Sequence, residues 1–299
     1  MKLPLMNFNL RNFPISILIL LLAAPLPAQQ ASAADPSPID PKGIVRRSVE
    51  IDDRTVSLAR DYTYQQREVR KHLGSHGELK FTKVETWDIT NLYGEPYSRL
   101  IQKDDKPLSA KDEKEEEEKL DKFFSKRREE SEEGRQKRQA KEKKEREEEW
   151  GFIREVVNAY DFRIVGEEAV DGRDGWVIEA TPRKDFRPTK PNAGMLSKIK
   201  GKIWIDKQDY SWVKVEGEAI DTISVGLFIA RIHKGSHFSF EQVRLNNEVW
   251  LMRRLHVDVN ARLLLLGNRA VELEETFSNY KKFATNTKIL PEVREVEPK

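Results

Sequence analysis

The sequence predicts a mainly β protein of the α+β class: an antiparallel β-barrel or curled sheet with covering helices and a long charged helical insertion. Most segments after residue 59 alternate apolar with polar residues, which is typical of strands that bury one face. Turns containing glycine or asparagine separate these segments and favour antiparallel hairpins. The alternation stops between residues 109 and 160, where charge dominates. Strands with one apolar face each favour a curled sheet that turns this face inward onto helices.

The chain divides by composition into six segments. We expect a signal peptide at 1–33, a leader and N-terminal helix at 34–58, the first part of the half-barrel at 59–108, a charged helical insertion and docking helix at 109–160, the second part of the half-barrel at 161–283, and a C-terminal tail at 284–299. No repeat at a fixed period is visible.

The first 33 residues have the build of a secretory signal. Lys2 and Arg11 supply the positive start, Ile15 to Ala24 form an apolar run, and Ala31-Ser32-Ala33 is a small-residue cleavage site. We expect cleavage after Ala33, with Ala28 as the second choice. An uncleaved anchor is the alternative, but it needs ~20 apolar residues and prolines interrupt this run. The mature chain is therefore expected to be periplasmic or secreted and not membrane-spanning.

The charge of the mature chain excludes one class of partner. Lys2 and Arg11 are the charged residues of the signal, so 51 of the 53 basic residues remain, against 51 acidic ones. A neutral chain has no electrostatic basis for binding nucleic acid. The sequence contains no cysteine, so stability has to come from one sizeable core rather than from disulfides.

The first part of the chain predicts one helix and three strands. Asp40 is placed to cap a short helix that begins with Pro41 and ends before Asp61. The strand positions on shared faces are Tyr62, Tyr64 and Gln66, then Leu79, Phe81, Trp87 and Ile89 after a glycine turn, then a third strand from Tyr97 to Gln102.

The segment from 111 to 149 predicts a charged helix. Ser109 and Asp112 resemble a capping box. Pairs four residues apart stabilise a helix by ~0.2 to 0.5 kcal/mol each: Glu115 with Lys119, Glu118 with Lys122, Glu133 with Lys137, and Glu142 with Arg146. A dimerising coiled coil lacks its apolar seam here, so a solvated helix broken or kinked near Gly134 is the favoured interpretation. It would project or fold back as a helical hairpin, and the apolar spacing of residues 150–160 predicts a last piece that docks on the sheet.

The second part returns to strands. They run from Phe162 to Glu167, through Trp176, Ile178 and Ala180, from Phe238 onward, through Leu255 to Leu263, and through Val271, Leu273 and Phe277. Pro182 to Ser197 has no period and predicts a mobile loop. Ile220 to Ile232 is apolar and fits either a short helix or a strand.

The central hairpin spans Gly201 to Ala219. Ile203 and Ile205 alternate with polar residues, as do Val213 and Val215 after a polar link. The link lacks glycine, which predicts a loop of four or five residues built on a type I turn. Trp204 and Trp212 fall on the more polar face, where rim positions or contacts with a docked helix are expected. For the tryptophans in general, core or rim packing and an aromatic ligand clamp both remain open.

This hairpin, with its pattern Gly-x-Ile-Trp-Ile-Asp-x-x-Asp-Tyr followed by a Val-Lys-Val-Glu strand, resembles the central hairpin of periplasmic outer-membrane lipoprotein-sorting proteins (Lol-type carriers). The resemblance extends from Arg60 to Lys282 without the charged insertion. It implies an unclosed barrel that holds an acyl chain on its concave face. The candidate ligand-binding residues are Ile203, Ile205, Val213, Val215, Leu255, Val257, Val259 and Leu263. The alternative is that these residues are plain core.

The functional hypothesis is an exported, non-enzymatic protein of the cell envelope that binds a lipid, an acyl chain or an acylated lipoprotein without a cofactor. An interaction or scaffold module that uses residues 111–149 to reach an envelope protein is the alternative, and an envelope hydrolase is the third. His72 and His76, like His233 and His237, are four apart, but neither pair lies in a convincing helix, so no metal site is expected. Motifs for phosphate loops, nucleophile elbows and zinc proteases are absent.

Overall fold

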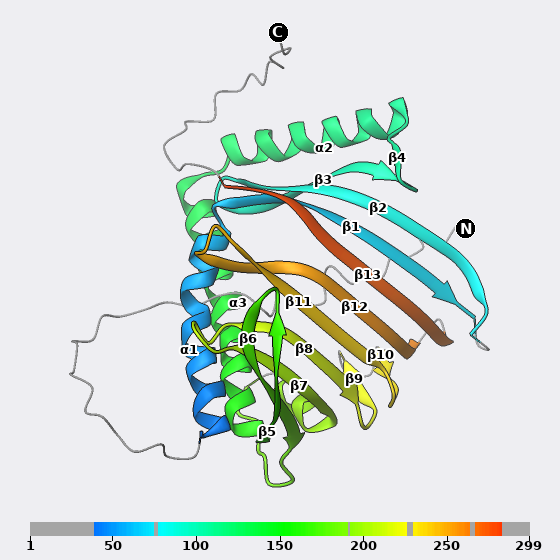
Figure 1. Ribbon diagram of the computed structural model, residues 1–299. Helices are drawn as coiled ribbons and strands as arrows, with labels where there is room; N and C mark the ends of the chain where they lie inside the picture. The colour runs from blue at the N-terminus through cyan, green and yellow to red at the C-terminus, as the bar shows by residue number, and fades with distance from the viewer. Residues whose placement is uncertain (1–38, 75–76, 191, 226–229, 264–266, 283–299) are drawn as a thin grey trace.

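One curved antiparallel sheet forms the body of the protein, and helices cover part of its concave face (Figure 1). The computed structural model describes residues 39–74, 77–190, 192–225, 230–263 and 267–282. The expected signal peptide and the tail at 284–299 lie outside the described residues.

The elements follow the chain in this order: α1 (Pro41–Ala59), β1 (Tyr62–Leu73), β2 (Leu79–Leu92), β3 (Glu95–Lys103), β4 (Lys106–Pro107), α2 (Ala110–Arg128), α3 (Glu132–Ala159), β5 (Tyr160–Val170), β6 (Arg173–Pro182), the 3-10 helix η3 (Ala193–Lys198), β7 (Ile199–Asp206), β8 (Trp212–Ala219), β9 (Ile223–Val225), β10 (Ala230–Ile232), β11 (His237–Leu245), β12 (Val249–Leu263) and β13 (Gly267–Lys282).

The strand order confirms the half-barrel. The 13 strands run β4-β3-β2-β1-β13-β12-β11-β8-β7-β6-β5, and β10 with β9 adds to β12 beyond the end of β11. Every pair is antiparallel. Within the described residues β4 and β5 form the two edges and do not pair with each other, so the sheet stays open.

Helix α1 begins at Pro41 and ends before Asp61, as the sequence predicted. The Asp40 side chain accepts a hydrogen bond from the Lys42 amide at 3.0 Å, and Pro41 occupies the first helical position. The helix continues for 19 residues to Ala59. It lies beside α3, and both cover the concave face (Figure 1).

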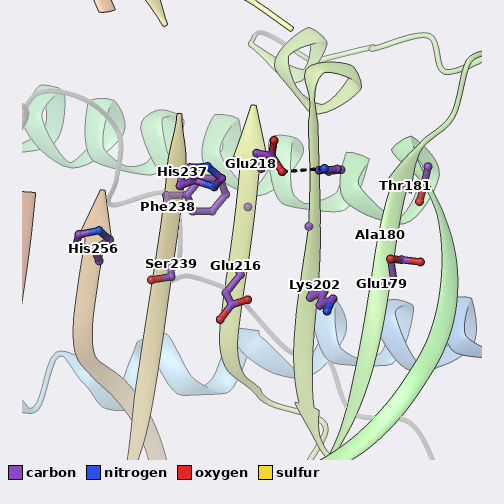
Figure 2. A pocket seen from close by; sticks show the side chains of 13 residues that line it. Glu179, Ala180, Thr181, Lys202, Glu216, Glu218, His237, Phe238, Ser239 and His256 are labelled. Carbon is purple, nitrogen blue, oxygen red and sulfur yellow. Dashed lines mark ion pairs between the residues drawn. The ribbon is translucent and has the colours of Figure 1, made fainter. Parts of the chain in front are cut away.

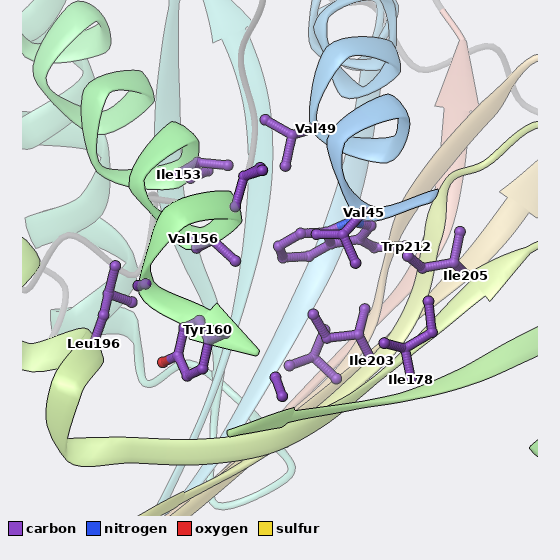
Figure 3. Packing of buried hydrophobic residues seen from close by; sticks show 14 of the residues in the cluster. Val45, Val49, Ile153, Val156, Tyr160, Ile178, Leu196, Ile203, Ile205 and Trp212 are labelled. Atoms are coloured by element: carbon purple, nitrogen blue, oxygen red, sulfur yellow. The ribbon is translucent and has the colours of Figure 1, made fainter. Parts of the chain in front are cut away.

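The main core lies between these two helices and strands β5 to β8, β11 and β12 (Figure 3). Val45 and Val49 of α1 and Ile153 of α3 pack against Ile178 and Ile203 of the sheet. Trp212 joins them because its indole Nε1 donates to the Ser48 hydroxyl at 2.6 Å, and Ser48 is fully buried. This contact with a docked helix matches one of the two environments expected for Trp212.

The Ser48 hydroxyl anchors α1 to the sheet, so Ser48→Ala should lower the free energy of unfolding by about 1–3 kcal/mol, because it leaves a buried indole N–H without an acceptor. Thermal and urea unfolding would measure this. Ser197→Ala is the matched control, since the Ser197 hydroxyl donates to the Gly194 carbonyl at 2.8 Å in an exposed position. Equal losses in both variants would contradict the anchoring role.

Of the two arrangements expected for the charged insertion, projection from the sheet is wrong. The insertion forms two helices, and α2 lies along β3 (Figure 1). Glu116 is buried and its carboxylate accepts from the Leu100 amide at 3.1 Å, while Phe123 packs on Tyr97 with ring centroids 4.9 Å apart. The helix is docked because Glu116 and Phe123 face β3. The sequence pattern did not distinguish these buried contacts from the solvated charges on the rest of the helix.

The helix breaks at residues 129–131, near Gly134 as the sequence predicted. Ser131 caps α3 by accepting from the Gly134 amide at 3.1 Å, so Gly134 belongs to the first turn. The capping box at Ser109 and Asp112 is confirmed, with the Asp112 amide donating to the Ser109 hydroxyl at 3.2 Å. Of the four predicted pairs, Glu133 with Lys137 forms an ion pair at 2.7 Å.

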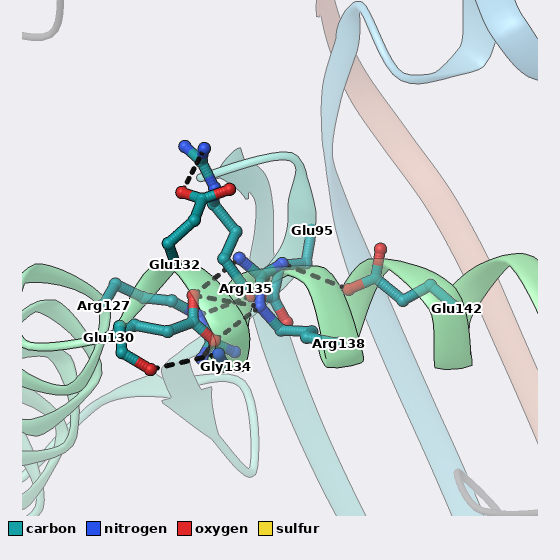
Figure 4. Close-up of polar contacts among 9 residues, drawn as sticks. Glu95, Arg127, Glu130, Glu132, Gly134, Arg135, Arg138 and Glu142 are labelled. Atoms are coloured by element: carbon teal, nitrogen blue, oxygen red, sulfur yellow. Dashed lines mark hydrogen bonds and ion pairs between the residues drawn. The ribbon is translucent and has the colours of Figure 1, made fainter.

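Partly buried charges fix the joint between α2 and α3 (Figure 4). The Arg127 side chain, 9% exposed, lies 2.6 Å from the Glu95 carboxylate. Arg138 donates from Nη2 to Glu130 Oε2 at 2.9 Å and from Nε to Glu130 Oε1 at 3.0 Å. Arg138 also lies 3.3 Å from Glu95. Hydrogen bonds from Arg138 hold the pKa of Glu130 below its ordinary value. The joint is thus tied to the turn that begins β3.

The ambiguous segment at 220–232 forms strands, and the segment predicted as a mobile loop, 182–197, contains most of a 3-10 helix. Residues 220–232 contain β9 and β10, and positions 226–229 lie outside the described residues. The segment expected to be an irregular loop contains η3 at Ala193–Lys198. Of the helices that the structure describes, none has the length and apolar content needed to cross a membrane.

Candidate functional site

An apolar cavity of about 320 Å³ lies between the concave face of the sheet and the covering helices. One wall comes from Phe152, Ile153, Val156 and Tyr160, at the α3–β5 end, and from Met195 and Leu196 of η3. The opposite wall is the sheet. Its lining side chains with apolar character are Ala180, Ile199, Ile203, Trp212, Val215, Ala219, Ile223, Ile232, Phe238, Phe240, Met252, Leu255, Val257 and Val259. The cavity therefore offers hydrocarbon contacts on both sides.

Five of the eight predicted ligand-binding residues line this cavity: Ile203, Val215, Leu255, Val257 and Val259. Ile205 belongs to the same core but is fully buried and does not line the cavity. The side chain of Leu263 lies outside the described part of the chain. The ligand-binding role of all these residues stays a proposal.

Val213 departs from the expected arrangement. It packs with Val177, Trp204 and Trp250 in a separate cluster and does not line the cavity. The register of β7 with β8 shifts between Trp204 and Ile205, so that Ile205 pairs with Trp212. This irregularity interrupts the alternation of faces along β8, and the sequence pattern does not reveal it. As a result Trp212 packs in the concave core, whereas Val213 does not.

The sequence predicted only part of the helical wall of the cavity. The apolar spacing of residues 150–160 predicted a docking helix but not that Phe152 and Val156 would face a cavity. Met195 and Leu196 lie in a segment without hydrophobic period, so no sequence signal pointed to them. Proximity of η3 to α3 and β7 makes them part of the wall.

Two glycines shape the cavity wall on the sheet side. Gly201 and Gly217 are register partners on β7 and β8. A Cβ at Gly217 would lie 2.3 Å from ring atoms of Phe238, so the ring occupies the space that a side chain would need. A Cβ at Gly201 would lie 2.4 Å from the Glu216 carbonyl oxygen. The glycines thus let Phe238 lie across the sheet as part of the lining.

Tyr160 carries a polar atom into this lining. Its side chain is 6% exposed, and burial raises the pKa of its hydroxyl well above the ordinary value. The hydroxyl therefore stays protonated across the physiological pH range and can donate a hydrogen bond.

Beyond the cavity, the concave face becomes acidic. Leu255, which lines the cavity, is the register partner of Glu275 on β13, and Glu275 is the partner of Glu68 on β1. Burial and the charge of Glu68 raise the pKa of Glu275 to about 7. Glu68 is 3% exposed, and Arg70 lies 2.7 Å from its carboxylate. A partly neutralised acid pair therefore borders the apolar surface.

A second hollow of about 460 Å³ lies on the face of the sheet opposite the helices (Figure 2). Glu179, Lys202, Glu216, His237 and His256 are among its lining residues. Lys200 pairs with Glu218 at 2.8 Å. This groove is larger than the apolar cavity, and its lining carries charges of both signs.

The histidines do not form a metal centre in the described part of the chain. No group of three or more metal-ligating side chains gathers there. His72 stacks on Phe81 with ring centroids 4.2 Å apart, and its predicted neighbour His76 lies outside the described residues.

Comparisons with known proteins give similarities of fold. No family model and no curated protein matches the sequence. A LolA superfamily protein from Nitrosomonas europaea aligns at 9% identity and a TM-score of 0.28, covering 83% of this chain and 96% of that one. A putative outer-membrane lipoprotein-sorting protein domain from Vibrio parahaemolyticus aligns at 13% identity and 0.28, covering 82% and 95%.

The Pseudomonas aeruginosa MucA/MucB complex contains a further match, at 11% identity and a TM-score of 0.24, covering 83% of this chain and 100% of that one. At these identities and TM-scores the matches carry no inference about function. The names of two of the three mention the LolA superfamily or lipoprotein sorting.

Proposed function

We propose that this protein binds a hydrocarbon chain of a lipid or acylated lipoprotein in the cavity between the concave face and α3, as a non-enzymatic component of the cell envelope. The observation that supports the proposal is the apolar lining on both walls of the 320 Å³ cavity. Concave apolar sites with few polar groups are the usual form of ligand sites. Export rests on the predicted signal peptide.

The energetics are sufficient without covalent chemistry. Burying a chain of about twelve carbons at ~0.8 kcal/mol per methylene contributes about 10 kcal/mol before the costs of ordering. Two polar groups accompany the apolar lining: Tyr160 lines the cavity, and Glu275 is the register partner of the lining residue Leu255. The ligand is therefore expected to be amphipathic.

Native mass spectrometry of protein purified from membranes tests the proposal directly. We expect a co-purified lipid, and added long-chain fatty acid or lipopeptide should stabilise the delipidated protein by about 2.7 kcal/mol at a hundredfold excess over the dissociation constant. A spectrum without lipid together with no thermal stabilisation would contradict hydrocarbon binding.

Blocking the cavity should abolish this stabilisation. Val257 lines the cavity and is only partly buried, so Val257→Phe has room to extend into it. A ring that excludes about three methylenes at ~0.8 kcal/mol each should weaken fatty-acid binding by about fiftyfold, as measured by displacement of a fluorescent fatty acid.

His256→Phe is the matched control for this variant. His256 is the preceding residue of β12 and lines the opposite groove. It should bind fatty acid as the unaltered protein does. Equal affinities of the two variants would place the ligand elsewhere.

A partner protein for residues 111–149 remains a second proposal with weaker support. The ion pairs of α3 at Lys141–Glu145 and Lys144–Glu148 are exposed and satisfied within the helix. Such a face is soluble without a partner, so the structure favours the cavity as the functional site.

A further inference from the structure

One hydroxyl group in the apolar cavity is left unpaired by the fold. Tyr160 lines the cavity and is 6% exposed, and in the part of the chain that the structure describes its hydroxyl makes no hydrogen bond. Figure 3 shows the ring beside the last turn of α3, with its oxygen directed away from Ile178 and Ile203 of the sheet. The hydroxyl is therefore a buried donor that the described protein groups do not satisfy.

The other polar side chains of the described cavity lining are accounted for. The Ser236 hydroxyl accepts from the Asn260 amide at 3.2 Å, and the Trp212 indole donates to Ser48 at 2.6 Å. Three further side chains extend from the opposite face of the sheet, because their neighbours on each strand line the cavity (Figure 2): Lys202, Glu216 and His237. Tyr160 is thus the side chain that can donate to a molecule in the cavity.

A buried hydroxyl without a partner is unusual, because it has given up its hydrogen bond with water and received nothing in exchange. A ligand that brings an oxygen acceptor to this hydroxyl gains affinity. A ligand without an acceptor leaves the donor unpaired. The Tyr160 hydroxyl therefore favours a molecule that combines a hydrocarbon chain with an acceptor oxygen.

The volume of the cavity limits the number of chains. An apolar cavity of about 150 Å³ holds one benzene molecule, which has six carbons. By the same ratio the 320 Å³ cavity holds about thirteen carbons. One chain of this length fills the cavity and leaves no room for a second.

The concave face next to the cavity offers no apolar groove for a second chain on the β13 side. The lining residue Leu255 is followed across the sheet by Glu275 and then Glu68. Arg70 lies 2.7 Å from the Glu68 carboxylate, and the two side chains are 13% and 4% exposed. A chain lying over this pair would remove the last water from two charges, which costs free energy.

We propose that the cavity binds a single-chain acyl amphiphile, with roughly a dozen carbons inside it and a carbonyl or carboxylate oxygen that accepts a hydrogen bond from the Tyr160 hydroxyl. The inference rests on the proposed binding of hydrocarbon and deepens it, since it specifies the number of chains and the chemistry of the polar end. A fatty acid and a lysophospholipid share this chemistry.

Chain length tests the limit to one chain. Fatty acids with shorter and longer chains are titrated into the delipidated full chain below their critical micelle concentrations, against a fluorescent fatty acid. The affinity should rise about fourfold per methylene and level off at about thirteen carbons, with one fatty acid bound per protein. An affinity that keeps rising in longer chains, or two molecules bound per protein, would overturn the limit.

Tyr160→Phe tests the acceptor, because it keeps the ring and removes the hydroxyl. The affinity for laurate should fall about tenfold. The ligand-free variant should be as stable as the unaltered protein or slightly more stable, since no hydrogen bond of the described chain is lost. Dodecyltrimethylammonium has a chain of the same length and no acceptor, so the variant should bind it unchanged. An unchanged affinity for laurate would overturn the role of Tyr160.

Tyr62→Phe is the matched control. Tyr62 is 4% exposed and does not line the cavity, and its hydroxyl donates to the Glu248 carboxylate at 2.7 Å and accepts from the Asn246 side chain at 2.6 Å. This variant should be less stable than the unaltered protein and bind laurate with the same affinity. Equal losses of laurate affinity in the two variants would count against a specific contact with Tyr160.

Lauroyl lysophosphatidylcholine distinguishes the two sources of the acyl chain. Its acceptor near the chain is an ester carbonyl, whereas that of laurate is a carboxylate. The source is the ligand that binds the unaltered protein more tightly and loses affinity in the Tyr160→Phe variant. If neither ligand loses affinity in the variant, the inference is wrong.

The same titrations separate this inference from the proposed function. A protein that binds neither laurate nor dodecyltrimethylammonium has no hydrocarbon site, which overturns both. A protein that binds both ligands, without an effect of Tyr160→Phe and without a limit on chain length, keeps the hydrocarbon site and overturns the inference alone.

Discussion

Arg173→Met is expected to lower the free energy of unfolding by about 3–5 kcal/mol, the range found when one partner of a buried ion pair is removed. The Arg173 guanidinium donates from Nε and Nη2 to the two carboxylate oxygens of Asp206, both at 2.6 Å. Asp206 is 1% exposed, so removal of the guanidinium leaves a buried carboxylate without its cation.

The same carboxylate organises the turn of the central hairpin. Asp206 Oδ1 accepts from the amides of Gln208 and Asp209 at 2.8 and 2.9 Å. Burial would raise the pKa of Asp206, but the Arg173 guanidinium and these two amides outweigh it and hold the pKa below its ordinary value. Loss of Arg173 should therefore raise the pKa of Asp206 and disturb the turn together with the pair.

Urea unfolding at neutral pH measures the loss in free energy of unfolding, and two further variants serve as controls. Arg163→Met removes a pair with Glu179 at 2.7 Å in which the arginine side chain is 72% exposed, and it should cost less than about 1 kcal/mol. Combining Arg173→Met with Asp206→Asn should recover most of the stability, because the amide keeps an acceptor for the turn and leaves no buried charge. A loss below that of Arg163→Met would contradict the role of the pair.

The central hairpin shows how far local pattern reaches. Alternation and the polar link predicted both strands and a loop of four or five residues, and five residues, Lys207 to Ser211, separate β7 from β8. The pattern did not predict that Asp206 would be buried, because its cation lies 33 residues earlier on β6. Only the pairing of β6 with β7 brings the two together.

The charged insertion shows the same limit. The missing apolar seam argued against a coiled coil, and the chain forms two helices instead. Docking of α2 depends on Glu116 reaching the backbone of Leu100, a contact that composition does not encode. Sequence patterns therefore predict periodic elements well and contacts between polar groups of distant strands poorly.

The sequence also did not predict the acid pair on the concave face, Glu68 and Glu275. Leu273 and Phe277 were predicted on one strand face, and Glu275 occupies the position between them on that face. A single polar residue among apolar residues on one strand face is usually a residue whose side chain is exposed to solvent. Here the register of β1 with β13 places Glu275 opposite Glu68 instead, so the polar residue is explained by its partner on another strand.

Glu275→Gln is expected to stabilise the protein at alkaline pH and much less under acidic conditions. Burial and the neighbouring Glu68 raise the pKa of Glu275 from 4.5 to about 7, while Arg70 opposes the rise. A carboxyl whose pKa is raised by folding binds its proton more tightly in the native state. The native protein therefore loses stability as pH rises from about 4.5 through 7, by about 3 kcal/mol at ~1.36 kcal/mol per pKa unit.

Glutamine does not titrate, so the gain from Glu275→Gln should appear across this pH window and reach its full size above pH 7, as followed by thermal unfolding from acidic to alkaline buffer. Glu274→Gln is the control, since Glu274 is the adjacent residue, points to the other face and pairs with Arg254 at 3.1 Å. Glu68→Gln should flatten the wild-type pH dependence too, because it removes the charge that opposes ionisation of Glu275. A gain that is the same at every pH would show that burial and Glu68 do not perturb Glu275, and the concave face would then carry two ionised acids beside the cavity.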